Sequence, residues 1–254
     1  AALAALVVGG GAAFAAAPPA AAQTTPDTPP PRTLLVGPGR PYATLAAALA
    51  AARAFDTLSL APGAYAERAV LNLEGLTLVG EGGGAMLTWT TDRPYEAALV
   101  AAAPNCAASN LSIRHSSPSV ADNYAVHVSD PAASLTLDRV SAASATGTGL
   151  GADGRVGAVG CTFSGNSRYG AALFAKDCRL EGCTLSDNGA GGVLARSAWR
   201  LSLVRCTVAN NRGPGLDLVS GSGGAAECEV RGNRGQGARA GRAWGEDEDE
   251  DEGG

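Results

Sequence analysis

Residues that could perform chemistry are few and scattered in this chain. It has only two histidines, His115 and His127, both far in sequence from most of its six cysteines, and no cysteine pair with C-x-x-C spacing. A zinc site needs such ligands at a recognisable spacing, so we predict no metal site and no cofactor. Catalysis by paired carboxylates needs acids within several ångströms of each other. The best acidic group is Asp122, Asp130, Asp138 and Asp153, and we assign no catalytic residue.

Hydroxyl and arginine side chains offer a candidate binding surface instead. Threonines and serines recur at equivalent places along the chain and would line one outward strip, although threonine is also a common residue of exposed strands. Arginines concentrate late in the sequence, where they could meet an acidic polysaccharide, a protein or the chain's own acidic tail: Arg196, Arg200, Arg205, Arg212, Arg231 and Arg234. Our candidate binding residues are Thr162, Ser164, Thr184, Ser186, Thr207, Arg205 and Arg212.

An internal repeat gives the strongest signal of fold. Cysteines recur at intervals of 22, 23 and 22 residues: Cys161, Cys183, Cys206 and Cys228. Each is followed five places later by an asparagine and nine places later by a glycine; the asparagines are Asn166, Asn188, Asn211 and Asn233. Upstream the register is fainter, with Asp138 in the cysteine column and Ala143 in the asparagine column, and the array covers most of residues 70–243.

Alternating apolar residues within each unit indicate short strands joined by turns. Strands at a constant period of about 22 residues predict a parallel β-helix, with coils about 4.8 Å apart and roughly eight coils in all. Cysteine suits an inward stack as a small hydrophobe, and we expect these thiols to be free. Stacked asparagines tolerate left-handed turns and can hydrogen-bond from coil to coil, so we interpret both columns as structural ladders.

The first coil is predicted to carry an atypical end unit. Residues 34–36 and 57–60 have the pattern of strands, and residues 42–55 that of a helix with leucines at i and i+4. A solenoid needs such a unit to close its core. The fold class we predict is therefore all-β, a right-handed parallel β-helix solenoid with an N-terminal capping α-helix.

The two ends of the chain differ from this body. Residues 1–31 are an apolar, alanine-rich segment followed by a proline-rich linker, and residues 1–22 resemble a secretory signal peptide. If they are one, the protein is secreted or on the cell surface; otherwise it is intracellular. The β-helix domain spans residues 32–243, and residues 244–254 form an acidic tail that should stay solvated.

Charge and hydropathy exclude some partners. The formal charge of −5 is dominated by seven consecutive acids, and the rest of the chain carries 19 basic against 17 acidic residues. Nucleic-acid binding needs a basic surplus, so we expect no nucleic-acid partner. After position 30 the chain has no apolar run long enough to span a membrane.

Three segments carry a family resemblance. They are V-G-P-G-R-P-Y-A-T-L at residues 36–45, D-T-L-S-L-A-P-G-A-Y-A-E at 56–67 and L-T-L-V-G-E-G at 76–82. Together with the repeats, they resemble the right-handed parallel β-helix (pectin-lyase-like) superfamily. The repeats are similar to those of carbohydrate-binding proteins, sugar hydrolases and F-box-type β-helix domains. The calcium-binding acids of pectate lyases and the aspartate and Gly-His-Gly blocks of polygalacturonases have no counterpart in this sequence.

The resemblance defines a fold that hosts many functions. We therefore expect a non-catalytic, monomeric domain that binds polysaccharide or protein along its lateral face. Two alternatives remain open, a polysaccharide-active enzyme of the pectate-lyase or glycoside-hydrolase type, and the substrate-binding part of an F-box-type ubiquitin ligase receptor.

Overall fold

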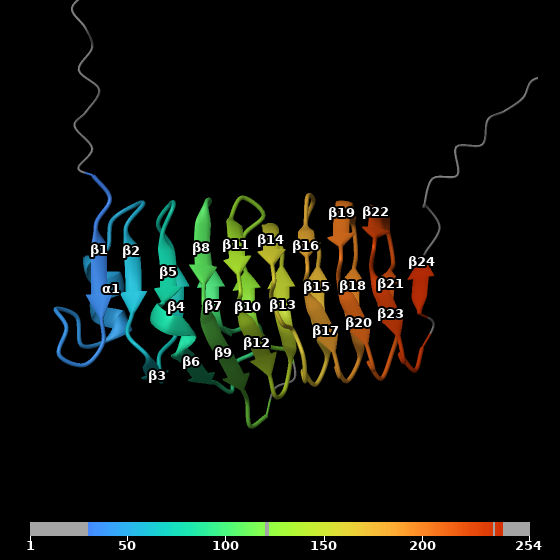
Figure 1. The fold of residues 1–254 in the computed structure, drawn as a ribbon, viewed down its shortest axis with the longest axis horizontal. Coiled ribbons are helices and arrows are strands. Elements are labelled where there is room, and N and C mark those ends of the chain that lie inside the picture. The colour runs from blue at the N-terminus through green and yellow to red at the C-terminus, as the bar shows by residue number, and fades with distance from the viewer. Residues whose placement is uncertain (1–29, 120–121, 236, 241–254) are drawn as a thin grey trace, which may run out of the picture. The chain divides into compact units, whose positions relative to one another are not determined.

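The computed structural model describes residues 30–119, 122–235 and 237–240. The predicted signal peptide, most of the linker and the acidic tail lie outside these residues. From residue 31 onward the described chain forms one compact unit, in which three parallel sheets run along a stack of coils (Figure 1). None of the described helices is long and apolar enough to cross a membrane.

From β2 onward the chain visits the three sheets in the same order in each coil, and we number the sheets by that order. Sheet 1 has nine strands: β1 (Thr33–Val36), β2 (Thr57–Leu60), β5 (Thr77–Gly80), β8 (Cys106–Ser109), β11 (Ser134–Asp138), β14 (Arg155–Val159), β16 (Arg179–Glu181), β19 (Ala198–Val204) and β22 (Gly221–Ala226). All of its pairings are parallel, as expected when each strand belongs to a successive turn. The nine strands confirm a parallel β-helix of about nine turns.

Sheet 2 is interrupted in the middle of the stack. Its first part contains β3 (Gly63–Tyr65), β6 (Ala85–Thr90), β9 (Leu111–Ser116) and β12 (Ser141–Ser144), and its second part β17 (Thr184–Ser186), β20 (Thr207–Ala209) and β23 (Glu229–Arg231). Only single bridges through Thr162, to Ser141 and to Thr184, connect the two parts.

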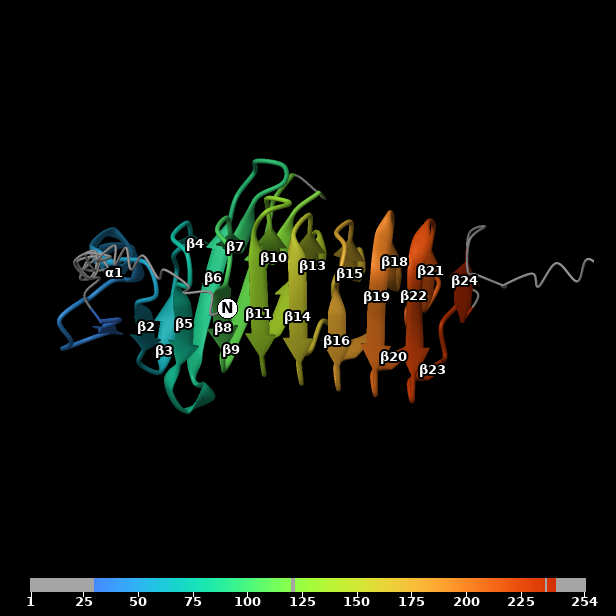
Figure 2. The ribbon, with the colours of Figure 1, turned by 90° about the horizontal axis from the view of Figure 1, so that it is seen from above.

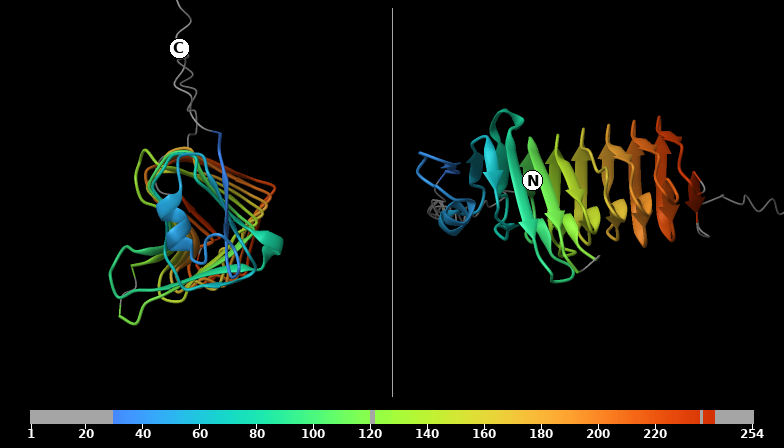
Figure 3. Two further views of the ribbon diagram at one scale, coloured as in Figure 1. Left: turned by 90° about the vertical axis from the view of Figure 1, so that its left-hand side faces the viewer. Right: turned by 90° about the horizontal axis from the view of Figure 1, so that it is seen from below.

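Sheet 3 has eight strands: β4 (Ala69–Leu71), β7 (Ala97–Ala101), β10 (Tyr124–Val128), β13 (Thr148–Ala152), β15 (Tyr169–Leu173), β18 (Gly191–Ala195), β21 (Leu216–Leu218) and β24 (Ala238–Ala240). Two loops lead into it from sheet 2, residues 91–96 after β6 and residues 117–123 after β9, of which 120 and 121 are not described. These loops extend beyond the outline of the coils (Figures 2 and 3).

The core lies inside the coils and is filled by the alternate residues of each strand. Sheet 1 shows this clearly, since Leu58 and Leu60 of β2 are buried whereas the alternate residues Thr57 and Ser59 are not. Equivalent leucines stack from coil to coil, for example Leu58 on Leu78. Leucine, valine and alanine make up most of this core, and Phe163 and Tyr65 are the aromatic residues among its described buried side chains.

Left-handed turns occur at fixed places in the coil. The residue directly before each ladder asparagine has a positive φ; these residues are Gly165, Asp187, Asn210 and Gly232. The residue directly before each ladder cysteine also has a positive φ; these are Gly160, Gly182, Arg205 and Glu227. We predicted the left-handed geometry for the ladder asparagines themselves, and this was wrong by one position. Short polar residues and glycine tolerate this region best, which explains most of the residue choices.

The helix is shorter than predicted. Helix α1 spans Leu45–Ala51 rather than residues 42–55, begins at the N-cap Thr44 and has Leu45 and Ala48 fully buried. Glu67 accepts hydrogen bonds from the backbone N–H groups of Leu45 at 3.0 Å and Ala46 at 2.8 Å, and so satisfies two free donors of the first turn. A single 3-10 turn, η1 (Glu81–Gly83), follows β5. The capping role of α1 stays a prediction.

The upstream register also differs from the prediction. Asp138 pairs with Val159, and the position of the ladder cysteine is taken by Val140, whose N–H donates to the Cys161 sulfur at 3.5 Å. The asparagine position is taken by Ser144, whose N–H donates to Asn166 Oδ1 at 2.7 Å. The offset between these coils is 21 residues at Ser141 and Thr162 but 22 at Ser144 and Asn166, because Gly165 lengthens the intervening turn.

Candidate functional site

The predicted hydroxyl strip lies on the outer face of sheet 2. Thr184 pairs with Thr207, and Thr162 bridges to Thr184 on the other side. Ser164 and Ser186 are within 3.1 Å of each other through their hydroxyl oxygens. The row continues toward the N-terminus through Ser141 and Ser112, so five consecutive coils present a hydroxyl where the sequence indicated three.

The two predicted arginines are not part of one cluster with these hydroxyls. Arg205 stands at the corner between sheets 1 and 2, where its guanidinium forms an ion pair with Glu181. Arg212 follows β20 at the opposite corner and is exposed. Two other late arginines are also paired, Arg200 with Asp177 of the preceding coil at 2.5 Å and Arg231 with Glu229 of its own strand at 2.5 Å. Neighbouring coils therefore already neutralise part of this charge.

The four aspartates of the predicted acidic group do not converge. Asp138 lies in sheet 1 beside Arg139 at 2.7 Å, and Asp130 accepts a hydrogen bond from the N–H of Ala132 at 2.7 Å in a turn. Asp122 forms an ion pair with Arg168, and Asp153 lies 3.0 Å from His127. Within the described ranges no three His, Cys, Asp or Glu residues gather as ligands for a metal ion.

The two structural ladders form continuous stacks. Asn188 is fully buried, and its Oδ1 accepts from the N–H of Asn166 at 3.0 Å and from Asn166 Nδ2 at 2.8 Å. Asn211 and Asn233 repeat the arrangement one coil further on. All six cysteines are free thiols, five of them buried. Burial raises the pKa of the Cys178 thiol to about 11, and the neighbouring Cys161 thiol contributes most to the pKa of about 11 for Cys183.

A groove of about 190 Å³ lies on the outer face of sheet 3, and it was not predicted. Its wall and floor come from four coils: Asp122, Asn123, Tyr124, Thr148, Arg168, Tyr169, Ala172, Phe174, Leu194 and Arg196. The strands β10, β13, β15 and β18 form the floor, and the loop before β10 supplies Asp122 on one side. A concave surface that combines aromatic and apolar side chains with convergent polar groups is a common form of a ligand site.

Aromatic side chains converge on this groove although the chain has few of them. It contains only four Phe, three Trp and five Tyr residues, and Tyr124, Tyr169 and Phe174 line the groove together. The sheet makes room for both tyrosine rings with glycines. A Cβ atom on Gly151 would lie 2.4 Å from the Tyr124 ring, and one on Gly191 would lie 3.0 Å from the Tyr169 ring.

A third tyrosine, Tyr95, lies one coil further toward the N-terminus. It stands in the loop after β6, is 65% exposed and has a φ of 61°. A non-glycine residue with this backbone conformation is uncommon and is retained when surrounding contacts hold it. The N–H of Tyr95 donates to the backbone oxygen of Asp122 at 2.7 Å, which ties the backbone of Tyr95 to a residue at the rim of the groove, although the Tyr95 side chain does not itself line the groove.

The charged residues of the groove differ in how they are paired. Arg168 is held by its ion pair with Asp122, so the pair offers donors and acceptors with little net charge. Arg196 is exposed and has no ion pair among the described residues, and it leaves one uncompensated positive charge beside Phe174 and Leu194.

A histidine–aspartate pair lies next to the groove. The His127 ring stacks on the Tyr124 ring with centroids 4.4 Å apart, and its Nε2 is 3.0 Å from Asp153 Oδ2. Burial lowers the pKa of His127, and Asp153 opposes this effect. The ring is therefore predominantly neutral at pH 7, and its contacts fix the orientation of Tyr124.

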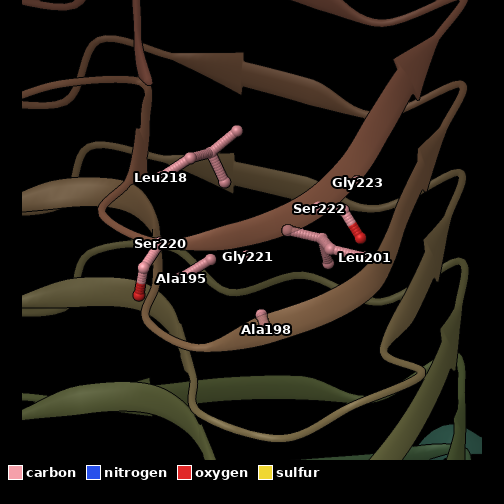
Figure 4. A pocket seen from close by; sticks show the side chains of 8 residues that line it. All are labelled: Ala195, Ala198, Leu201, Leu218, Ser220, Gly221, Ser222 and Gly223. Atoms are coloured by element: carbon pink, nitrogen blue, oxygen red, sulfur yellow. The ribbon is translucent and has the colours of Figure 1, made fainter. Parts of the chain in front are cut away.

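Two other cavities are poor candidates. The cavity in Figure 4, between Leu201 of β19 and Gly223 of β22, has a volume of about 10 Å³, close to the least that a single water molecule needs. It lies beside a register shift between Ala198 and Leu201. A depression of about 350 Å³ on sheet 1 is lined by Arg155 and Asp177, whose charges pair with each other at 3.5 Å.

Fold and repeats together define the class of protein, a right-handed parallel β-helix. A family model described as right handed beta helix region matches residues 98–243, more than half of the chain, so the chain belongs to this family. No curated protein matches the sequence.

Solved structures are similar to this chain to different degrees. Pectate lyase Pel9A is similar with a TM-score of 0.55 and 17% identity, over 76% of this chain and 68% of that chain. Pectin methylesterase PemA from Erwinia chrysanthemi gives a TM-score of 0.46 and 14% identity over 69% and 78%. The tailspike protein gp49 from Acinetobacter baumannii bacteriophage Fri1, a capsular polysaccharide depolymerase, gives 0.49 and 10% over 82% and 45%. At these identities the likeness concerns the fold alone.

Proposed function

We propose that the protein binds a polysaccharide in the groove on sheet 3 without cleaving it. The observation that carries this proposal is the pair of rings, Tyr124 and Tyr169, that line the groove along the stack of coils, with the exposed Tyr95 next to its rim. Aromatic rings provide large, rigid apolar surfaces with a polar hydroxyl at one end, and sugar rings present both C–H faces and hydroxyl groups. The name of the structurally similar pectate lyase indicates a polysaccharide substrate for that protein, which supports the proposal at the level of the fold.

The geometry of these rings suits an extended chain. Tyr124 and Tyr169 are two coils apart, because Thr148 lies between them in the same column, which corresponds to roughly 10 Å along the stack. Tyr95 adds one further coil. An occupant that contacts all three rings must therefore run along the axis of the β-helix rather than across it. The groove and its rim then supply polar partners for hydroxyl or acidic groups of the polysaccharide, namely Arg168, Asp122 and Arg196.

Affinity electrophoresis in gels that contain single polysaccharides tests this proposal. We expect at least one neutral or acidic polysaccharide to retard the protein, and the double variant Tyr95→Ala/Tyr169→Ala to lose about tenfold or more in affinity, which is about 1.4 kcal/mol. The matched control is Thr184→Ala/Thr207→Ala on sheet 2. If the sheet 2 variant loses binding and the tyrosine variant keeps it, the predicted hydroxyl strip is the site and the groove proposal is wrong.

One observation favours an enzyme as the second candidate. His127 is neutral, fixed by Asp153 and stacked on Tyr124 at the edge of the groove, an arrangement suited to accepting a proton from a substrate. If the protein is an enzyme, incubation with the polysaccharide that it binds will generate new reducing ends, and His127→Gln will abolish them while retention in the gel persists. If it only binds, the reducing-end count will stay at the level of the buffer control.

A further inference from the structure

A second groove, of about 330 Å³, lies on the outer face of sheet 2. It is lined by side chains from β6, β9 and β12, among them Thr88, Thr90, Arg114, Ser116, Ala143 and Ala145. These strands lie side by side near the centre of the stack (Figure 1). This groove belongs to a different face from the groove on sheet 3 and does not share a residue with it.

The break in sheet 2 explains why the groove exists. β6 and β9 are six residues long, whereas β12 has only four and the next coil contributes a single bridge at Thr162. Arg114 pairs with Thr88 on one side and with Ala143 on the other. The small residues Ala143 and Ala145, with Gly165 beyond them, leave the space next to the guanidinium unfilled.

The charge of the groove is positive and uncompensated. Arg114 is exposed and forms no ion pair with any described residue, and no acidic residue lines the groove. Most other arginines of the β-helix are paired, for example Arg68 with Glu96 at 3.5 Å and Arg40 with Glu81 at 2.5 Å. An unpaired guanidinium in a concave site presents five N–H donors to whatever enters.

The hydroxyl groups add donors from a second direction. The Thr90 and Ser116 hydroxyls are 2.9 Å apart, so one donates to the other and one hydrogen remains for a ligand. The Thr88 hydroxyl donates weakly to the Tyr65 backbone oxygen at 3.4 Å and retains its lone pairs. An unpaired guanidinium and a separate hydroxyl donor that line the same groove, with no acidic residue beside them, suit an anion with several acceptor oxygens.

We propose that this groove binds a tetrahedral oxyanion, a sulfate or phosphate group, through Arg114 and the Thr90–Ser116 hydroxyl pair. The group can be a free ion or an ester on a larger molecule, because the same oxygens are presented in both cases. The proposal is independent of polysaccharide binding on sheet 3, and either one can fail without the other.

Thermal unfolding of the whole protein with inorganic sulfate, inorganic phosphate or glucuronate tests the site, with chloride at matched ionic strength as the reference. A ligand that binds only the folded state raises the unfolding temperature by mass action. We expect sulfate or phosphate to raise it above the chloride reference, and Arg114→Gln to weaken the apparent affinity about tenfold or more, as for loss of a hydrogen bond to a charged group. The matched control is Arg212→Gln, which removes another exposed arginine without an ion pair among the described residues, at the corner of the same sheet.

The outcomes are distinct. The proposal is wrong if sulfate raises the unfolding temperature of Arg114→Gln and Arg212→Gln equally, or if it raises that of the wild type no more than chloride does. If glucuronate raises the unfolding temperature more than sulfate does, the assignment to a tetrahedral anion is wrong. If Arg114→Gln is too unstable to compare, Ser116→Ala serves instead, with an expected severalfold loss. A sulfated oligosaccharide that binds more tightly than inorganic sulfate, with the same dependence on Arg114, identifies the ester as the source; equal affinities identify the free ion.

Discussion

Replacing Asn188 by alanine is the sharpest test of the buried asparagine ladder. Asn188 is fully buried, and its Oδ1 is the acceptor for two donors of Asn166, the backbone N–H at 3.0 Å and Nδ2 at 2.8 Å. Its Nδ2 donates to the Phe163 backbone oxygen at 3.1 Å and to Asn211 Oδ1 at 2.9 Å. Alanine offers none of these partners, and Asn166 is itself only 2% exposed, so water does not readily replace them.

The expected magnitude follows from the groups that lose their partners. Each unsatisfied buried donor costs about 1–3 kcal/mol, and two donors of Asn166 are affected, so Asn188→Ala should lower the free energy of unfolding by about 2–6 kcal/mol. Asn233→Ala removes the same kind of acceptor at the half-buried end of the ladder, where water can enter, and should cost about 1 kcal/mol. Thr184→Ala, on the outer face of the same coil, should cost under about 0.5 kcal/mol.

Urea unfolding of the whole protein measures these differences, with the slope of the transition checked for each variant. We expect the order of stability to be Thr184→Ala, then Asn233→Ala, then Asn188→Ala. If Asn188→Ala and Thr184→Ala lose the same free energy, the assignment of the asparagine column to the interior is refuted.

Four further predictions follow from particular contacts. Gly151→Ala should displace the Tyr124 ring, because the new Cβ would lie 2.4 Å from it, and should therefore weaken retention of the protein by polysaccharide in the gel. The control Gly157→Ala has open space around its Cβ and should leave retention unchanged. If both variants are retained equally, Tyr124 does not have the proposed role. Hydrogen bonding to Arg32 lowers the pKa of Asp56 from 3.8 to about 2, so its contribution to stability is present above pH 4 and lost as the pH falls toward 2. The midpoint of urea unfolding, measured as a function of pH, should show this loss of stability in the wild type but not in Asp56→Asn. If the two curves run parallel, the ion pair with Arg32 does not contribute as expected. Glu67→Gln should destabilise the protein by about 1 kcal/mol in the same urea assay through weaker capping of α1, and no change argues against the cap. In a thiol-labelling time course Cys228, which is half-buried, should react before the five buried cysteines, and simultaneous labelling of all six counts against the inward ladder.

The repeat made the fold predictable from the sequence. A fixed period with alternating apolar residues leaves little choice other than stacked short strands, and strands β1 and β2 were located to within one residue at each end. The exact register of the coils upstream of Cys161 was harder to predict from the sequence. One additional residue in the turn at Gly165 changes the offset between neighbouring coils from 21 to 22 residues, and the upstream coil has no ladder cysteine to mark its register.

The groove on sheet 3 could not be derived from the repeat for a related reason. Tyr95, Tyr124 and Tyr169 are separated by 29 and 45 residues, and neither number is a multiple of the 22-residue period. The loop of residues 117–123 lengthens the coil before Tyr124, and the next coil has an offset of 24 residues between Tyr124 and Thr148. The one available signal was the scarcity of aromatic residues, which makes any grouping of them informative. The Arg114 groove depends on a break in sheet 2, and no residue pattern in the sequence indicates such a break.

The position of a bound oligosaccharide tests the central claim most directly. A crystal structure with an oligosaccharide of the polymer that retards the protein most should show sugar rings against Tyr124 and Tyr169, with the chain running along the stack of coils. Sugar rings on the hydroxyl strip of sheet 2, at Thr162, Thr184 and Thr207, with an empty groove on sheet 3, would contradict the account.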